Sequence, residues 1–153
     1  MSTLTYPGIK ESLLRRLDRL RPDSPRQWGR MNAHQAVCHL NDSFKGIIGL
    51  RPASPDETWF NRNVLRFVAL HTPLTWPKGG VPTRPEVDQE KGGTKPGDFA
   101  ADVAELRALI ARFGASPRDF TFQPHPAFGA LSESEWMRWA YRHVDHHLKQ
   151  FGV

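Results

Sequence analysis

The sequence has almost no cysteine: Cys38 is the only one among its 153 residues. One cysteine excludes an internal disulfide, and it excludes a zinc site built from several thiolates. We therefore expect any metal site in this chain to use imidazole and oxygen ligands.

Long hydrophobic runs are also missing. No apolar run approaches the roughly 18 residues of a membrane-spanning helix, and the first residues lack the apolar segment of a signal peptide. We expect no membrane partner and a cytoplasmic location. A glycine-rich phosphate loop, a serine nucleophile elbow and the H-E-x-x-H motif are absent as well.

Dense runs of one charge are scarce, although the net charge is +5, with 21 Lys and Arg against 16 Asp and Glu. Basic and acidic residues alternate through every segment, and the one dense group is Arg15, Arg16, Arg19 and Arg21. A solvated helix face explains that group. We therefore expect no nucleic-acid partner.

Strand patterns are scarce too, and apolar residues instead recur at helical spacing. This spacing predicts five helices, over about residues 7–21, 32–50, 54–71, 98–113 and 132–151. Asn32 with Gln35, and Ser132 with Glu135, form two capping boxes, and Asp98 is the predicted N-cap of the fourth helix. The sequence therefore predicts an all-α protein, with residues 1–153 forming a single domain.

The strongest start signal is Ser54-Pro55-Asp56-Glu57, which combines an N-cap, a proline at the first position and acids in the first turn. The third helix should begin there and direct Phe60, Val64, Phe67 and Val68 inward. After it, residues 72–97 break the helical pattern with five Pro and five Gly. Loops of this length are uncommon inside compact domains and tend to be either functional lids or disordered.

Three of the seven histidines fall in one stretch of five residues inside the last predicted helix, positions 143–147. His143 and His147 are four residues apart, so they share one face of that helix and lie one turn from each other. They lie on the edge of an apolar stripe, where an unpartnered polar group costs about 1–3 kcal/mol. A shared metal ion would satisfy them. His146 lies a quarter-turn from His147, so it is the weaker candidate.

A third ligand has to come from another helix. Both His34 and His39 of the second helix are available, and periodicity alone does not separate them. The small residues Ala36, Ser43 and Gly46 surround His39 and leave room for a coordination sphere, which favours His39 mildly. Asp42 and Asp145 could orient the imidazoles, although solvated carboxylates are the simpler interpretation.

Two further residues, Cys38 and His125, carry side chains that could take part in chemistry. Cys38 precedes His39, but neighbours in a helix point about 100° apart, and nothing visible lowers the pKa of the thiol. A catalytic cysteine is therefore not predicted. His125, before Pro126, is most simply a loop anchor, with a pocket-lining role as the alternative.

With these residues in view, the chain resembles the DinB/YfiT-like superfamily of metal-dependent helical bundles, and within it a branch described only as a domain of unknown function. Three segments carry the resemblance: Met31 to Leu40, His125 to Gly129, and His143 to Phe151. Gly97-Asp98-Phe99 followed by Ala101-Asp102 fits the same branch.

The resemblance implies a four-helix bundle with one long crossover connection, plus an additional short helical segment. It also implies a divalent ion, zinc or nickel, held by His39, His143 and His147, with His34 and His146 outside the first coordination sphere. Relatives of this kind use low-molecular-weight thiols on small electrophiles.

We therefore expect a metal-dependent enzyme that transfers or isomerises a small electrophilic substrate with the help of a thiol. A metal-dependent hydrolase is one alternative. A non-catalytic, stress-associated bundle that binds a metal or ligand is the other. A homodimer is expected from the resemblance alone.

Overall fold

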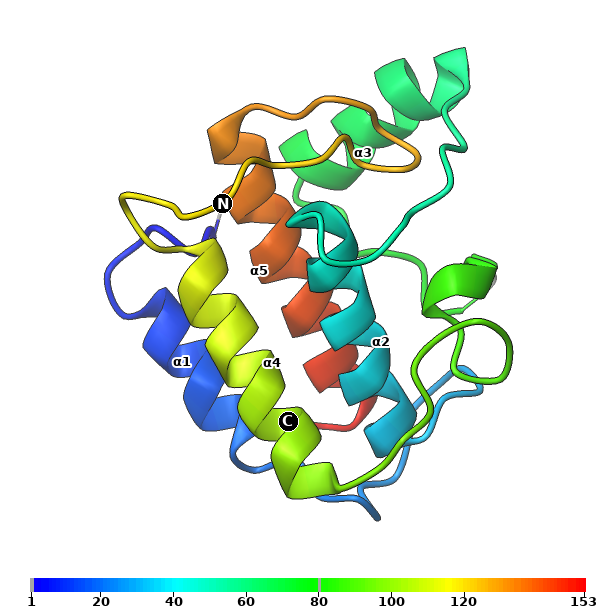
Figure 1. Cartoon of the computed structure of the whole chain (residues 1–153), viewed down its shortest axis with the longest axis vertical. Coiled ribbons are helices and arrows are strands. Elements are labelled where there is room, and N and C mark those ends of the chain that lie inside the picture. The colour runs from blue at the N-terminus through cyan, green and yellow to red at the C-terminus, as the bar shows by residue number, and fades with distance from the viewer. Residues whose placement is uncertain (1, 80) are drawn as a thin grey trace.

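Helices form the framework of the chain in the computed structural model, which describes residues 2–79 and 81–153 (Figure 1). Within these residues no β-strand occurs, so the all-α prediction is confirmed. The elements are α1 (Ile9–Leu17), α2 (Ala33–Ile47), a π-helical turn η1 (Asn61–Leu65), α3 (Arg66–His71), a 3-10 turn η2 (Pro85–Val87), α4 (Phe99–Phe113) and α5 (Glu133–Gln150).

The capping signals place the starts of three helices correctly. The Asn32 side chain accepts from the Gln35 N–H at 2.8 Å, and the Gln35 side chain accepts from the Asn32 N–H at 2.9 Å. Ser132 and Glu135 close the same reciprocal box at α5. At α4, Asp98 accepts from the Ala101 N–H. Each cap satisfies backbone donors that the first helical turn leaves unpaired.

The predicted start of the third helix at Ser54 is wrong. Residues 52–58 are not helical, because partners far along the chain bind their backbone. The Ser54 N–H donates to the Glu86 carboxylate, and the Asp56 N–H donates to the Pro126 carbonyl. Helical structure begins at residue 59, where the Thr58 hydroxyl accepts from the Asn61 N–H at 3.0 Å.

The inward face predicted for this segment is wrong as well. In α3 the buried residues are Ala69 and Leu70. The four residues expected inside are 36% to 59% exposed: Phe60, Val64, Phe67 and Val68. Residues 59–74 therefore present an apolar surface made of Trp59, Phe60, Val64, Leu65, Phe67, Val68 and Leu74.

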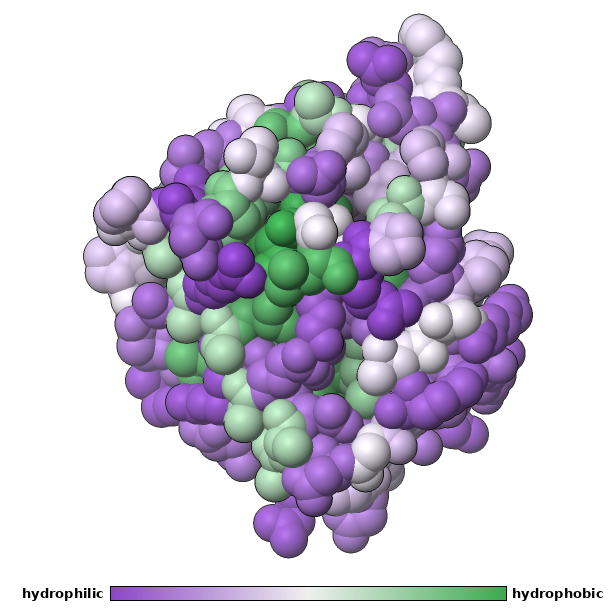
Figure 2. Space-filling view, in the orientation of Figure 1, coloured by the Kyte–Doolittle hydropathy of each residue, from purple (hydrophilic) through white to green (hydrophobic). Residues whose placement is uncertain are grey.

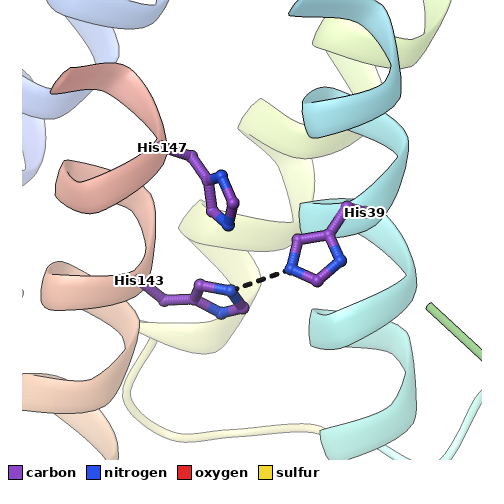
Figure 3. A group of neighbouring side chains, drawn as sticks. All are labelled: His39, His143 and His147. Carbon is purple, nitrogen blue, oxygen red and sulfur yellow. Dashed lines mark hydrogen bonds between the residues drawn. The ribbon is translucent and has the colours of Figure 1, made fainter. Parts of the chain in front are cut away.

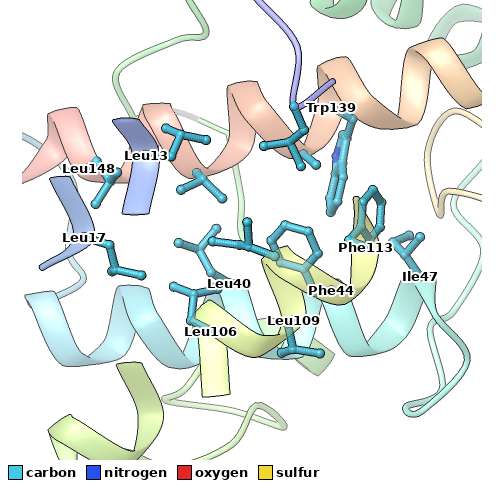
Figure 4. Packing of buried hydrophobic residues seen from close by; sticks show 14 of the residues in the cluster. Leu13, Leu17, Leu40, Phe44, Ile47, Leu106, Leu109, Phe113, Trp139 and Leu148 are labelled. Carbon is cyan, nitrogen blue, oxygen red and sulfur yellow. The ribbon is translucent and has the colours of Figure 1, made fainter. Parts of the chain in front are cut away.

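The core lies among α1, α2, α4 and α5 (Figure 4). α1 packs against α4 and α5, and α2 packs against the same two helices from the other side. Eleven of the twelve largest fully buried side chains come from these four helices: Leu13, Leu17, Val37, Leu40, Phe44, Leu106, Ile110, Phe113, Trp136, Met137 and Leu148. The twelfth is Leu70 of α3. Each such burial stabilises the fold by about 1.5–3 kcal/mol.

The long segment of residues 72–97 is tied to α2 through a buried carboxylate. Asp42, whose side chain is fully buried, accepts from the Thr94 N–H and hydroxyl, both at 2.7 Å, and from the Gln89 amide at 3.1 Å. Arg51 lies 3.1 Å from the same carboxylate. The expectation that Asp42 is solvated is therefore wrong, and the segment it holds packs over α2.

The surface in the view of Figure 2 is mostly hydrophilic, with hydrophobic residues gathered near its middle, over the gap between α2 and α4. Among the helices that the structure describes, none combines the length and apolar character needed to cross a membrane.

Candidate metal centre

Two helices bring three histidines together inside the helical framework (Figure 3). His39 comes from α2, while His143 and His147 lie one turn apart on α5. One ring nitrogen from each lies within 4.8 Å of the others. Of the two histidines weighed in the second helix, the structure brings His39 to this group.

A backbone carbonyl fixes the tautomer of His39. Nδ1 of His39 lies 2.8 Å from the Val87 carbonyl oxygen, which can only accept, so Nδ1 carries the proton and donates. The lone pair of the neutral ring is then on Nε2, which faces α5. Metal-binding histidines are commonly held by an acceptor on their second nitrogen in this way.

A buried glutamine does the same for His147. Nδ1 of His147 lies 2.8 Å from Oε1 of Gln150, and the Gln150 amide nitrogen donates to the Trp28 carbonyl at 2.9 Å. Because the amide nitrogen is directed to Trp28, the amide oxygen is left to accept from His147. Nε2 of His147 is therefore free to bind a cation.

His143 completes the group. Its Nε2 lies 3.1 Å from Nε2 of His39, and its Nδ1 is buried with no hydrogen-bond partner among the described residues. Two nitrogen ligands at zinc distances of about 2.0–2.1 Å lie about 3.3 Å apart in a tetrahedral site. The observed 3.1 Å separation is close to that value, so the pair fits a shared ion.

The electrostatics of the group keep the imidazoles neutral. Burial lowers the pKa of His39, and burial together with the charges of neighbouring histidines lowers the pKa of His143 and His147 well below the ordinary value. Neutral imidazole is the form that binds metal ions. All three rings are therefore ready to bind a cation near neutral pH.

Aromatic rings and the 72–97 segment enclose the group. Trp139 of α5 lies 5.0 Å from His143 between ring centroids, and Trp76 lies 5.9 Å from the same ring. Trp76 and Val87 both belong to residues 72–97. This long segment, for which a lid and disorder were the two alternatives, thus contributes a ring and a carbonyl to the surroundings of the histidines.

The other histidines do not join the group, and His71 pairs with Glu135 at 3.0 Å. His34 pairs with Asp102 of α4 at 2.6 Å, away from α5. His146 borders the group, since its ring lies 5.3 Å from that of His147 between centroids, but it is not one of the three that converge. It also contacts the rings of Trp28 and Trp76, at 5.5 and 6.0 Å. His125 anchors its own loop, because its Nδ1 accepts from the backbone N–H groups of residues 127 and 128.

Cys38 is not placed as a nucleophile. Burial and the charge of Asp102 raise the pKa of its thiol to about 12, so the thiolate is scarce at neutral pH. Its sulfur lies 3.5 Å from Asp102.

The groups that orient the imidazoles are not Asp42 and Asp145, the two carboxylates that the sequence offers for this role. Asp145 pairs with Arg16 at 2.6 Å and with Lys149 at 2.8 Å, so it does not reach the cluster. The Val87 carbonyl and Gln150 take that role instead. Gln150 could have been found, since it lies three residues after His147 on the same helix. A backbone carbonyl 48 positions from His39 leaves no such signal.

A cavity of about 440 Å³ opens beside the end of α2. It is lined by Gly46, residues 49–53, Pro55, Glu57 and residues 123–126, which include His125. The Trp139 ring lies 5.8 Å from His125 and 5.0 Å from His143, so it contacts both the cavity wall and the histidine cluster. His125 has the pocket-lining role that was weighed as its alternative.

Fold and site together define an all-helical protein in which two helices hold three imidazoles that could bind one metal ion. The chain belongs to the family described as protein of unknown function (DUF1569), whose model matches residues 1–152. The expectation that the chain belongs to a family of unknown function is thereby confirmed. Neither the curated proteins nor the solved structures contain a match to the chain.

Proposed function

We propose that this chain is a metal-dependent enzyme whose divalent ion, zinc or nickel, is held by His39, His143 and His147. The convergence of the three rings is the observation that carries the proposal. Two of them are held by acceptors on Nδ1, which leaves Nε2 of each directed to the same place. A purely structural packing of histidines would not require this common orientation.

A divalent ion at this position would lower the pKa of a bound thiol or water, which supplies a nucleophile near neutral pH. The protein's own part is to hold the three rings neutral and to limit access of water. Trp139 and Trp76 cover His143 on two sides, and the 72–97 segment closes over His39.

The substrate is a small electrophile in this proposal, and the reaction is thiol-dependent transfer or isomerisation. The cavity of about 440 Å³ is of a size that suits a small molecule. None of the three histidines lines it, and Trp139 is the ring that contacts both His125 of its wall and His143. The thiol rests on the resemblance to the DinB/YfiT-like superfamily, and so does the assignment of the fold as a DinB-like bundle. Packing of four helices around one core is compatible with that bundle.

Metal-assisted hydrolysis uses the same ion with water in place of the thiol. A non-catalytic metal-binding role is the remaining alternative. The test begins with the metal content of the purified full chain. Zinc-loaded and nickel-loaded protein is then assayed with small electrophiles, with and without a low-molecular-weight thiol.

Turnover that needs both metal and thiol is the expected result. Metal-dependent turnover without thiol would favour the hydrolase. Stoichiometric metal with no turnover in either assay would favour the binding protein, and absence of metal binding would contradict the proposal altogether.

A further inference from the structure

A second group of potential metal ligands lies at the interface of α2 and α4, outside the three-histidine cluster. His34 and Cys38 are four residues apart on α2, so they share one face. Asp102 meets them from the first turn of α4. One ligand atom from each of the three lies within 4.8 Å of the others.

The three side chains converge on one carboxylate oxygen. Oδ2 of Asp102 lies 2.6 Å from Nε2 of His34 and 3.5 Å from the Cys38 sulfur. The Gly97 N–H also donates to this oxygen at 3.3 Å. Neighbours hold the group in place: the Phe99 ring packs edge-on against His34, and the Asn41 amide donates to the Asp102 carbonyl at 2.9 Å.

The distances suit a small ion after a modest movement. Tetrahedral zinc places a nitrogen and an oxygen ligand about 3.3 Å apart, and sulfur about 3.5 Å from oxygen. The sulfur–oxygen distance already has that value. The His34 ring and the carboxylate must separate, and both can, since their side chains are 16% and 20% exposed. That exposed side also gives an ion and one water a path to the site.

The charge around the group favours a cation. Asp102 supplies a carboxylate with no Lys or Arg partner among the described residues. The other carboxylates that influence Cys38 are already paired, Asp42 with Arg51 and Glu105 with Lys45. A nitrogen, a sulfur and an oxygen donor form a set that zinc accepts readily.

We propose that His34, Cys38 and Asp102 form a second site, which takes a borderline-soft divalent cation of the zinc type. It is independent of the three-histidine centre. On binding, the ion forms a bond to sulfur, and the thiol proton is released to solvent. His34 moves its proton from Nε2 to Nδ1, which frees the Nε2 lone pair for the ion. The scarcity of cysteine excludes a thiolate cluster, but not a single thiolate in a mixed set.

Cobalt(II) alone is a suitable probe. It is added to the metal-free full chain. A reducing agent without a thiol keeps Cys38 reduced, because an added thiol would itself bind cobalt. A thiolate bound to cobalt gives a charge-transfer band in the near ultraviolet, which imidazole and carboxylate ligands do not give. Because Cys38 is the only cysteine, that band reports this site and not the three-histidine centre. We expect it within the first two equivalents of cobalt.

Variants separate the two sites. Cys38→Ser should remove the band. His34→Ala and Asp102→Asn should each weaken the cobalt affinity, measured from the band, by at least about tenfold. Replacing a residue that only supports a metal ligand already lowers metal affinity by about 10–100-fold, and these two residues are proposed ligands themselves. His143→Ala is the matched control, which disrupts the other centre and keeps the band. Loss of metal binding at one site can thus be detected while the other site still binds metal.

Absence of the band in the unaltered protein at excess cobalt would overturn the proposal, and this result requires no variant to fold. A band of unchanged affinity in both His34→Ala and Asp102→Asn would overturn it as well. In that case Cys38 would bind cobalt without the other two ligands.

Discussion

Oε1 of Gln150 accepts a hydrogen bond from Nδ1 of His147 at 2.8 Å, and this contact decides which nitrogen of the imidazole faces His39 and His143. The glutamine is 4% exposed, and its amide nitrogen is bound to the Trp28 carbonyl. The orientation of a proposed metal ligand thus depends on a residue that would not itself touch the ion.

Replacing Gln150 by leucine should therefore weaken zinc binding at the three-histidine centre. The expected loss is about 10–100-fold in affinity, because the acceptor that holds the His147 ring is removed. Zinc affinity is measured by competition with a chelator. Asp145→Asn is the matched control, since Asp145 lies two residues from His147 but pairs with Arg16 and Lys149. Equal affinity in the two variants would contradict the role given to Gln150.

Removal of any one of the three histidines should empty the centre. His39→Ala, His143→Ala and His147→Ala each leave two imidazoles, too few to retain the ion through purification. The variants are made in a Cys38→Ser background, so that elemental analysis counts this centre alone. His146→Ala and His34→Ala should keep the metal, because neither ring belongs to the cluster. Normal metal content in any of the first three would refute the ligand assignment.

His125 should make the fold sensitive to acid. Burial lowers its pKa to about 3, against an ordinary value of 6.5. Between these values the unfolded chain binds more protons than the folded chain, so this contribution to stability falls as the pH drops below 6.5. From pH 6.5 to 4.5 the loss is about 2 kcal/mol.

His125→Asn tests this directly. Its side-chain oxygen can replace Nδ1 as the acceptor for the N–H groups of residues 127 and 128, and it does not titrate. Urea unfolding at pH 7 and pH 4.5 should show a smaller loss of stability in the variant than in the unaltered chain. An identical loss would show that His125 is not the source.

Two glycines near the end of α2 should respond to alanine in opposite ways. A Cβ at Gly46 would meet the Ala53 Cβ at 3.7 Å, an ordinary contact, so Gly46→Ala should stabilise the helix by about 0.5–1 kcal/mol. Gly49 has φ +82°, where alanine is strained, so Gly49→Ala should destabilise by about 1 kcal/mol or more. The free energy of unfolding in urea gives both values, and the same sign for both would contradict this account.

Local signals in the chain were sufficient for much of the framework. The starts of α2, α4 and α5 follow from caps that act over three residues, and the structure places them as predicted. The cap signal at Ser54 is just as strong locally, yet it fails. Glu86 and Pro126 bind the backbone there, and both lie more than 30 positions away. A cap competes poorly with partners that the rest of the fold holds in place.

For the candidate site, too, one part could be predicted from the sequence and another part depended on packing. That His143 and His147 share a face follows from the sequence alone, because four residues make about one helical turn. Periodicity does not say which histidine of α2 joins them; the small neighbours of His39 favour it mildly, and the resemblance selects it. Packing decided it: α4 approaches His34 with Asp102, while α5 approaches His39 with His143.

The sequence by itself thus determined the helical class, three helix starts and the histidine pair, since these depend on contacts within a few residues. Tertiary structure brought His39 and not His34 to this pair, and it alone decided the acceptors at Val87 and Gln150 and the exposure of the apolar residues between 59 and 74. Each of these depends on which distant segment packs against which face. That choice is made by the burial of the whole core and not by any one turn of helix.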